Sequence, residues 1–304
     1  MLDILFALIP SVIFGSMSLL LMLFGGTDRQ KITGLYTGGF LTAATVTPFL
    51  EVHWDVKTWV VSFISGALLG WGLYDQTVCL RVIGVSRTMP ISTGLQLAFM
   101  SLGGVLLFGE LQAPGALPVG ILAIVLLIAG VWLTSLHEKT SAQSSPEQNI
   151  DWPRGIRLLT TSTIGLVAFL LLAQWFGIDG QSIMLPQSFG CLVTGYLLSS
   201  PMRERLHGRP RKNENSRWAP ATFRQMLTGI LWASAVLIQQ ISTARNGVAV
   251  GFTLSQLGVI ISTLGGIVLL GEHRTRREAI WTGAGVILVV LGAVCAGLAQ
   301  AMDT

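Results

Sequence analysis

The chain has 304 residues, of which 51% are hydrophobic and only 11% are charged, with a mean hydropathy of +0.66. Ordinary soluble domains carry roughly 25% charged residues, so the composition excludes a typical soluble domain and predicts a protein that uses the lipid bilayer as its solvent. The net charge of +4 does not indicate a nucleic-acid partner, because the basic residues lie in the loops between apolar segments.

Ten apolar segments are long enough to cross a membrane, since a spanning helix needs roughly 20 residues. We expect an all-α integral membrane protein with transmembrane helices at 2–24, 32–50, 58–79, 88–108, 114–136, 154–176, 180–200, 225–245, 249–270 and 278–300. Pro186 would lie well inside the seventh helix, where we expect it to bend the helix.

Two hydrophilic segments interrupt this pattern. Residues 137–153 form a polar linker that divides the chain into a first five-helix repeat at 1–136 and a second at 154–304. Residues 202–224 form a second, basic insert.

Lysine and arginine are distributed unequally between the loops. The loops after the odd-numbered helices hold 16 of these residues, and the loops after the even-numbered helices hold only Lys57 and Arg245. Basic loops stay in the cytoplasm, so the linker should be cytoplasmic and both termini should lie outside the cytoplasm. We expect a multi-pass protein of a bacterial-type inner membrane.

One segment occurs twice. The stretch Gly84–Glu110 recurs as Asn246–Glu272, with seven identities in 27 positions, six of them in the phrase LGGxxLxGE. This predicts an internal duplication. Five helices per half is an odd number, so the second copy should enter the membrane from the opposite side, as in transporters whose substrate site lies between inverted repeats.

Asp75 is the only carboxylate well inside a predicted span. An ionisable group in the membrane is a candidate functional residue, and burial would raise its pKa toward the range in which it can load and release a proton. Three interpretations remain open: proton coupling, contact with the substrate, and a structural role.

Uncharged polar side chains form the second candidate site. Ser92 and Gln96 lie four residues apart on one helix face, Gln256 lies on the matching helix of the second repeat, and Gln239 and Gln187 lie on two further helices. Trp71 and Trp232 could supply flat apolar walls. Amides both donate and accept hydrogen bonds, which suits a neutral sugar or polyol; the alternative is that they only join helices.

Glu110 and Glu272 end matching helices, where the helix dipole disfavours a carboxylate. We expect a compensating partner, such as the N-terminus of the next helix or Arg274. This favours a structural latch over a substrate contact.

Catalytic and metal-binding signatures are missing from the sequence. Cys79, Cys191 and Cys295 have no metal-ligand spacing, and there is no HExxH, GxSxG or Walker motif. We therefore expect neither an enzyme nor a bound metal or cofactor.

The segment Gly84–Glu110, with MPISTGLQL at its centre, resembles the signature of the glucose/ribose porter family in the drug/metabolite transporter superfamily. GILW at 229–232 and GVAVGFTLSQLGVIISTLGGIVLLGE at 247–272 agree with it. The resemblance implies ten helices in two inverted repeats and proton-driven uptake of a sugar. The positions that match are Ser86, Pro90, Ser92, Thr93, Gln96, Ser255, Gln256 and Glu272.

The sequence thus predicts a secondary transporter that moves a neutral sugar or polyol by proton symport with alternating access. One alternative is a drug or metabolite exporter of the same superfamily that uses Asp75 as a cation or proton site. Another is a membrane sensor or scaffold that docks partners through the basic insert 202–224. The sequence does not indicate an oligomeric state.

Overall fold

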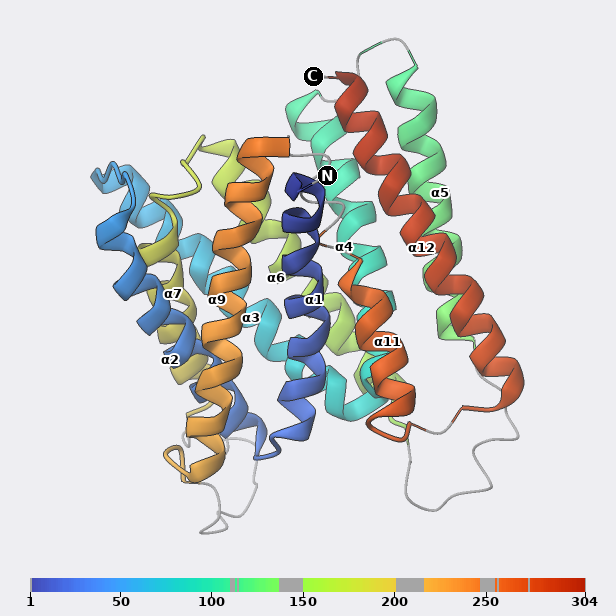
Figure 1. The fold of residues 1–304 in the computed structure, drawn as a ribbon, viewed down its shortest axis with the longest axis horizontal. Helices are drawn as coiled ribbons and strands as arrows, with labels where there is room; N and C mark the ends of the chain where they lie inside the picture. The colour runs from blue at the N-terminus through green and yellow to red at the C-terminus, as the bar shows by residue number, and fades with distance from the viewer. Residues whose placement is uncertain are drawn as a thin grey trace.

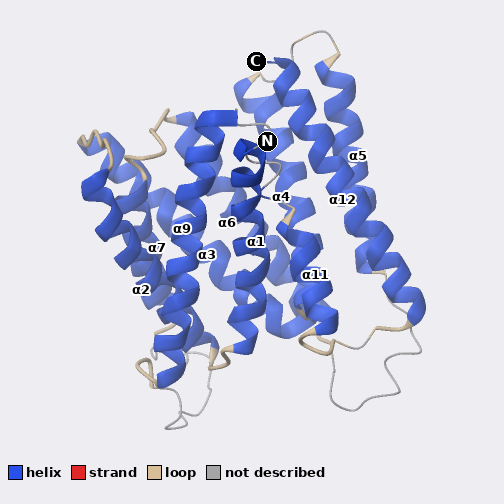
Figure 2. Cartoon of the chain, viewed as in Figure 1, coloured by secondary structure: helices blue, strands red, loops and turns tan. Residues whose placement is uncertain are grey.

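The computed structural model describes residues 2–109, 113, 115–136, 150–200, 216–246, 255, 257–272 and 274–303. In these ranges every regular element is a helix (Figures 1 and 2). The helices are α1 (Leu2–Leu23), α2 (Asp28–Val46), η1 (Thr47–Phe49), α3 (Val56–Ile83), α4 (Val85–Phe108), α5 (Ala116–Ser135), α6 (Trp152–Trp175), α7 (Met184–Leu198), α9 (Pro220–Asn246), α11 (Gly258–Val268) and α12 (Arg276–Asp303).

In the described part of the chain, ten α-helices fall on the ten predicted segments, although α11 is described only over Gly258–Val268. Six of them, in α3, α4, α5, α6, α9 and α12, are long and apolar enough by themselves to cross a membrane. The bend expected at Pro186 is wrong, because α7 begins only at Met184. Pro186 therefore lies in the first turn, where its missing N–H group leaves no hydrogen bond unmade.

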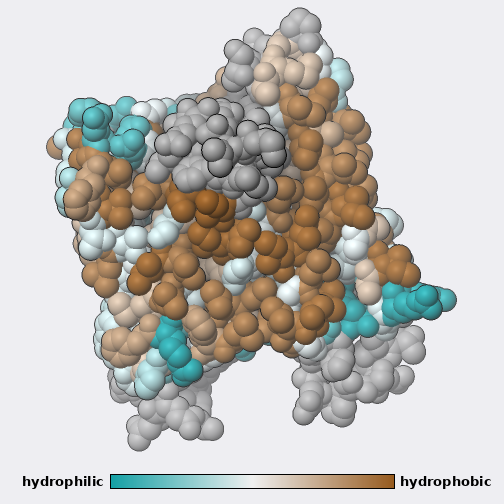
Figure 3. Space-filling model, in the orientation of Figure 1, coloured by the Kyte–Doolittle hydropathy of each residue, from teal (hydrophilic) through white to brown (hydrophobic). Residues whose placement is uncertain are grey.

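The outer surface is apolar over a broad band. Figure 3 shows hydrophobic residues across the middle of the visible face and hydrophilic residues near its upper and lower edges. Large side chains such as Leu106 (78% exposed), Trp132 (65%) and Ile287 (61%) point outward. Exposed apolar surface on this scale requires lipid around it, so the chain is a multi-pass membrane protein.

Helices from the two halves of the chain pack on each other. The pairs are α1 with α9 and α11, α2 with α7 and α9, α3 with α6 and α7, α4 with α6, α11 and α12, and α5 with α12. Figure 1 shows the α5–α12 pair at one edge of the molecule and α2 with α7 at the other. Helix α1 begins and α12 ends at the same, upper end in that view.

Short polar sequences fix where the helices begin. Thr27 and Gln30 form a reciprocal capping box at the start of α2, while the carboxylates of Asp55 and Asp151 accept N–H groups at the starts of α3 and α6. At the same end as the α2 cap, Arg81 Nη2 lies 2.7 Å from Asp28 Oδ2 and joins α3 to α2.

Candidate functional site

A cavity of about 560 Å³ lies between α1, α3, α4, α6, α7, α9 and the start of α11. Its size is ordinary for a small-molecule site. Most of the wall is apolar, and the polar residues that line it are Ser18, Gln76, Thr77, Thr93, Gln96, Gln174, Gln187, Gln239 and Ser255. None of the lining residues in the described part of the chain is charged.

On one side of the cavity, two amides share one serine. Gln76 Nε2 on α3 donates to Ser92 Oγ on α4 at 2.8 Å, and Gln96 Nε2 donates to the same oxygen at 2.9 Å. Ser92 is fully buried and does not line the cavity. The expectation for Ser92 therefore changes: it holds two lining amides in place.

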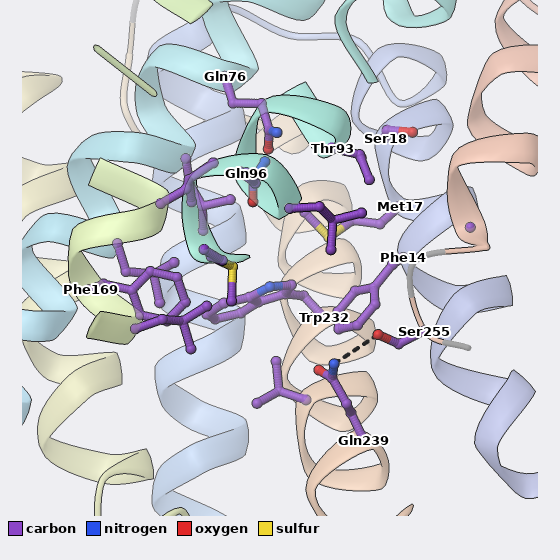
Figure 4. Close-up of a pocket in the computed structure, with 18 of the residues that line it drawn as sticks. Phe14, Met17, Ser18, Gln76, Thr93, Gln96, Phe169, Trp232, Gln239 and Ser255 are labelled. Atoms are coloured by element: carbon purple, nitrogen blue, oxygen red, sulfur yellow. Dashed lines mark hydrogen bonds between the residues drawn. The ribbon is translucent and has the colours of Figure 1, made fainter. Parts of the chain in front are cut away.

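Two further lining amides are held in the same way. Gln239 Nε2 on α9 donates to Ser255 Oγ at 2.8 Å (Figure 4). Gln187 Nε2 on α7 donates to Ser65 Oγ at 2.9 Å, and that hydroxyl donates to the carbonyl oxygen of Phe169. Within the described residues, the side-chain oxygens of these amides accept no hydrogen bond. They remain available to a ligand.

Aromatic side chains form a layer between the polar groups. Figure 4 shows the Trp232 ring between Gln96 on one side and Gln239 on the other, with Phe14 and Phe169 beside it. Trp71, in contrast, is not among the lining residues. Trp71 lies two positions from both Leu69 and Leu73, which do line the cavity. Residues two positions apart in an α-helix point about 200° apart around its axis, so Trp71 lies on the other side of α3.

Two glutamine residues of the lining, Gln76 and Gln174, were not anticipated from the sequence. Gln76 follows Asp75 directly, and the sequence interpretation of this segment rested on the ionisable Asp75. The signal that identifies Gln76 is its match with Gln239: each is followed 16 residues later by the serine that holds it. Gln256 lies outside the described residues, as does Glu110.

Asp75 does not line the cavity. Its side chain is buried, with 7% exposure, and points toward α6, where Thr161 Oγ1 lies 2.6 Å from Asp75 Oδ2. The same hydroxyl is 3.1 Å from the carbonyl oxygen of Arg157. Thr161 can therefore donate to an ionised Asp75, or donate to Arg157 and accept from a protonated Asp75.

Glu272 joins the two halves at one end of the bundle. It follows α11, and its carboxylate accepts the backbone N–H groups of Val85 and Ser86 and the Ser86 hydroxyl at the start of α4. Gly84, with φ of +91°, leaves room for this approach, because a Cβ there would lie 2.8 Å from Glu272 Oε2. The carboxylate thus satisfies N–H groups that have no partner within α4.

Two arginines lie beside this contact, the buried Arg87 and the half-buried Arg274. Arg274 Nη2 donates to Ser86 Oγ at 3.2 Å, and Arg87 lies 3.9 Å from Glu278. Burial lowers the pKa of the Arg274 guanidinium to about 10, and the positive charge of Arg87 acts in the same direction. Arg274 therefore still carries its charge at neutral pH. The sequence predicted the N-terminus of the next helix or Arg274 as the partner of Glu272; the partner is instead the N-terminus of α4 in the first half, and Arg274 contacts Ser86 Oγ beside it.

Known proteins resemble the chain over nearly its whole length. A family model described as "Sugar transport protein" matches residues 5–299. The chain is 35% identical over 298 residues to the glucose uptake protein GlcU of Bacillus subtilis, covering 98% of this chain and 99% of GlcU. It is 37% identical, with the same coverage, to a Listeria monocytogenes protein named for sugar uptake.

A solved crystal structure has the same fold. It superposes on the chain with a TM-score of 0.59 and covers 99% of both chains at 15% sequence identity. At that identity the likeness concerns the fold alone.

Proposed function

The chain belongs to the sugar transport protein family, and from this premise we propose that it carries a neutral sugar or polyol across the cytoplasmic membrane. The observation that carries the proposal is the cavity: its polar groups are amides and hydroxyls, and no described lining residue is charged. Amides can pair with each sugar hydroxyl as donor or acceptor, and Trp232 offers an apolar ring face.

The same observation weighs against the exporter alternative. A cationic drug would need an anionic group in the cavity wall, and Asp75 faces Thr161 instead of the cavity. The cavity therefore favours a neutral solute over a cation.

An inverted repeat is supported by the positions that line the cavity. On α1 and α6, the lining residues Phe14, Met17, Ser18 and Leu21 have the same spacing as Leu166, Phe169, Leu170 and Ala173. On α3 and α9, Leu69, Leu73 and Gln76 are spaced in the same way as Trp232, Val236 and Gln239. Such matching is expected if two copies of one five-helix unit enclose the site.

We further propose that transport follows alternating access. Glu272 binds the first turn of α4 at the end where Ile83 packs against Gly155, the start of α6. The cavity extends the other way, to Ile178 and Gly180 beyond the end of α6. The Glu272 contact would then hold the cytoplasmic end closed, with both termini on the opposite side of the membrane, and would release when that end opens.

The test of the proposed function is glucose counterflow in proteoliposomes. Purified protein in liposomes preloaded with unlabelled glucose should accumulate external radiolabelled glucose transiently, and mannitol should serve as a polyol probe. Empty liposomes are the control. If neither solute exchanges, while the protein is folded and inserted, the proposal is wrong.

We propose proton symport as the energy source, with Asp75 as the proton site. The support is the Thr161 hydroxyl, which can donate a hydrogen bond to the ionised Asp75 carboxylate or accept one from the protonated carboxyl group. Asp75 also precedes Gln76 on α3, so a change at the α3–α6 contact can reach a lining amide through one helix.

Asp75→Asn is expected to leave glucose counterflow within about twofold of wild type and to abolish accumulation driven by an inward pH gradient. Asparagine still accepts the Thr161 hydrogen bond, but it cannot load a proton. Uptake is measured in the same proteoliposomes with and without the gradient. Accumulation that stays at the wild-type level would remove Asp75 from the coupling mechanism.

A further inference from the structure

We propose that Gln76 and Gln239 are a matched pair of specificity residues, one from each half, that contact different hydroxyls of one sugar. The inference rests on the proposed function and deepens it. It assigns the hydrogen bonds by which the cavity recognises the hydroxyl groups of a sugar.

The two glutamines have the same local geometry. Each Nε2 donates to a serine Oγ at 2.8 Å, and each serine follows its glutamine by 16 residues in its own half of the chain. Ser92 is fully buried and Ser255 is 2% exposed. A serine fixed in the packed interior holds the amide in one orientation before the ligand arrives, which reduces the entropy lost on binding.

An amide held in this way presents two groups to the cavity. One N–H group is used by the serine, so the side-chain oxygen and the second N–H group remain. The oxygen accepts from one hydroxyl while the N–H donates to another. This pattern fits two adjacent hydroxyls of a sugar. Gln76 and Gln239 line the same cavity and lie on opposite sides of the Trp232 ring in Figure 4, so a sugar beside the edge of that ring would meet each amide with a different hydroxyl.

The cavity is not symmetric at the matching positions. In the register that aligns Gln76 with Gln239, Leu69 aligns with Trp232, and in the register that aligns Gly84–Glu110 with Asn246–Glu272, Gln96 aligns with Gly258. In the register that aligns α1 with α6, Ser18 aligns with Leu170. Among the described lining residues, Gln96 and Ser18 therefore have no polar counterpart at these matching positions, where the second half has Gly258, Leu170 and the indole ring of Trp232. The second half instead supplies the lining amides Gln174 and Gln187 from other positions.

A sugar that lacks one of the hydroxyls contacted by the pair leaves one amide, Gln76 or Gln239, without its partner. Leaving the carbonyl of either amide without a hydroxyl would cost affinity, because a site built for hydrogen bonds rejects a ligand that lacks them. The amides therefore select against deoxy sugars.

The experiment compares Gln76→Ala and Gln239→Ala with the exposed-loop control Gln181→Ala, using glucose and its monodeoxy analogues in counterflow. We expect each cavity variant to raise the KM for glucose roughly 10-fold, with Gln181→Ala unchanged. We also expect Gln76→Ala to abolish the preference for glucose over one deoxy analogue, and Gln239→Ala to abolish the preference for glucose over a different analogue. An unchanged KM for either variant, or the same analogue affected by both, overturns the proposal.

One further variant separates binding from folding. Ser92→Ala should shift the ratio of KM values between glucose and its deoxy analogues. If Ser92→Ala lowers the thermal stability and leaves that ratio intact, the serine is only structural and the positioning argument fails. If Gln76→Ala does not fold, Gln76→Met, which fills the same space, replaces it.

The outcomes also distinguish this inference from the function on which it rests. If wild-type protein moves glucose and the glutamine variants keep its kinetics, only the assignment of the amides is wrong. If folded wild-type protein moves no glucose and no mannitol, both fail.

Discussion

Gly66→Ala is expected to prevent the protein from accumulating in folded form. A Cβ at Gly66 would lie 1.9 Å from the carbonyl oxygen of Gln187 on α7, and the contact is to backbone, which cannot rotate away. From the other helix, a Cβ at Gly190 would lie 2.2 Å from the carbonyl oxygen of Phe63. The α3–α7 contact therefore requires glycine on both sides, and separating the helices should cost about 3 kcal/mol or more.

The matched control is Gly283→Ala on α12. A Cβ there meets no atom within 4 Å, so alanine should be neutral or should stabilise the helix by up to about 1 kcal/mol. Both variants are measured by the yield of monodisperse protein on size exclusion and by thermal unfolding in detergent. A Gly66→Ala protein with wild-type yield and unfolding temperature would show that α3 and α7 do not pack as closely as described.

Glu272→Gln is expected to lower the stability by about 2–4 kcal/mol, since hydrogen bonds to a buried charged group contribute about 1.5–3 kcal/mol each. The glutamine replaces one carboxylate oxygen with an NH₂ group. That group cannot accept the Ser86 N–H or hydroxyl. The substitution also removes the negative charge between the α4 N-terminus and Arg274, which favour an anion.

Thermal unfolding in detergent measures this loss, with Glu51→Gln in the exposed loop between α2 and α3 as the control. Counterflow adds a functional readout: if the contact closes the cytoplasmic end, the variant should bind external sugar less tightly because its open-outward state is less populated. Wild-type stability and wild-type affinity together would exclude the latch.

Much of the architecture follows from the sequence. The ten apolar segments and their order need only the length and hydropathy of each segment, because a chain crosses a bilayer almost only as helices or closed barrels. The linker predicted at 137–153 lies mostly outside the described residues and stays a prediction. Several site residues could be predicted for the same reason: an amide such as Gln96 or Gln239 is costly in lipid and therefore indicates a cavity or a partner.

Other assignments required the packing. Trp71 resembled a cavity wall as much as Trp232 did, since an apolar helix gives little sign of which face is turned inward. Ser92 resembled a ligand contact, and only its two hydrogen bonds reveal that it holds Gln76 and Gln96. Asp75 was prominent in the sequence, yet its direction toward Thr161 depends on where α6 lies.

The sequence alone determined that this chain is a bundle of membrane helices with uncharged polar groups inside, because the cost of polar and charged groups in lipid constrains composition and order. The tertiary structure alone decided which side chains share the cavity. That depends on helix rotation and on close approaches at residues such as Gly66 and Gly84, which are set by contacts between segments far apart in the chain and leave little trace in local sequence.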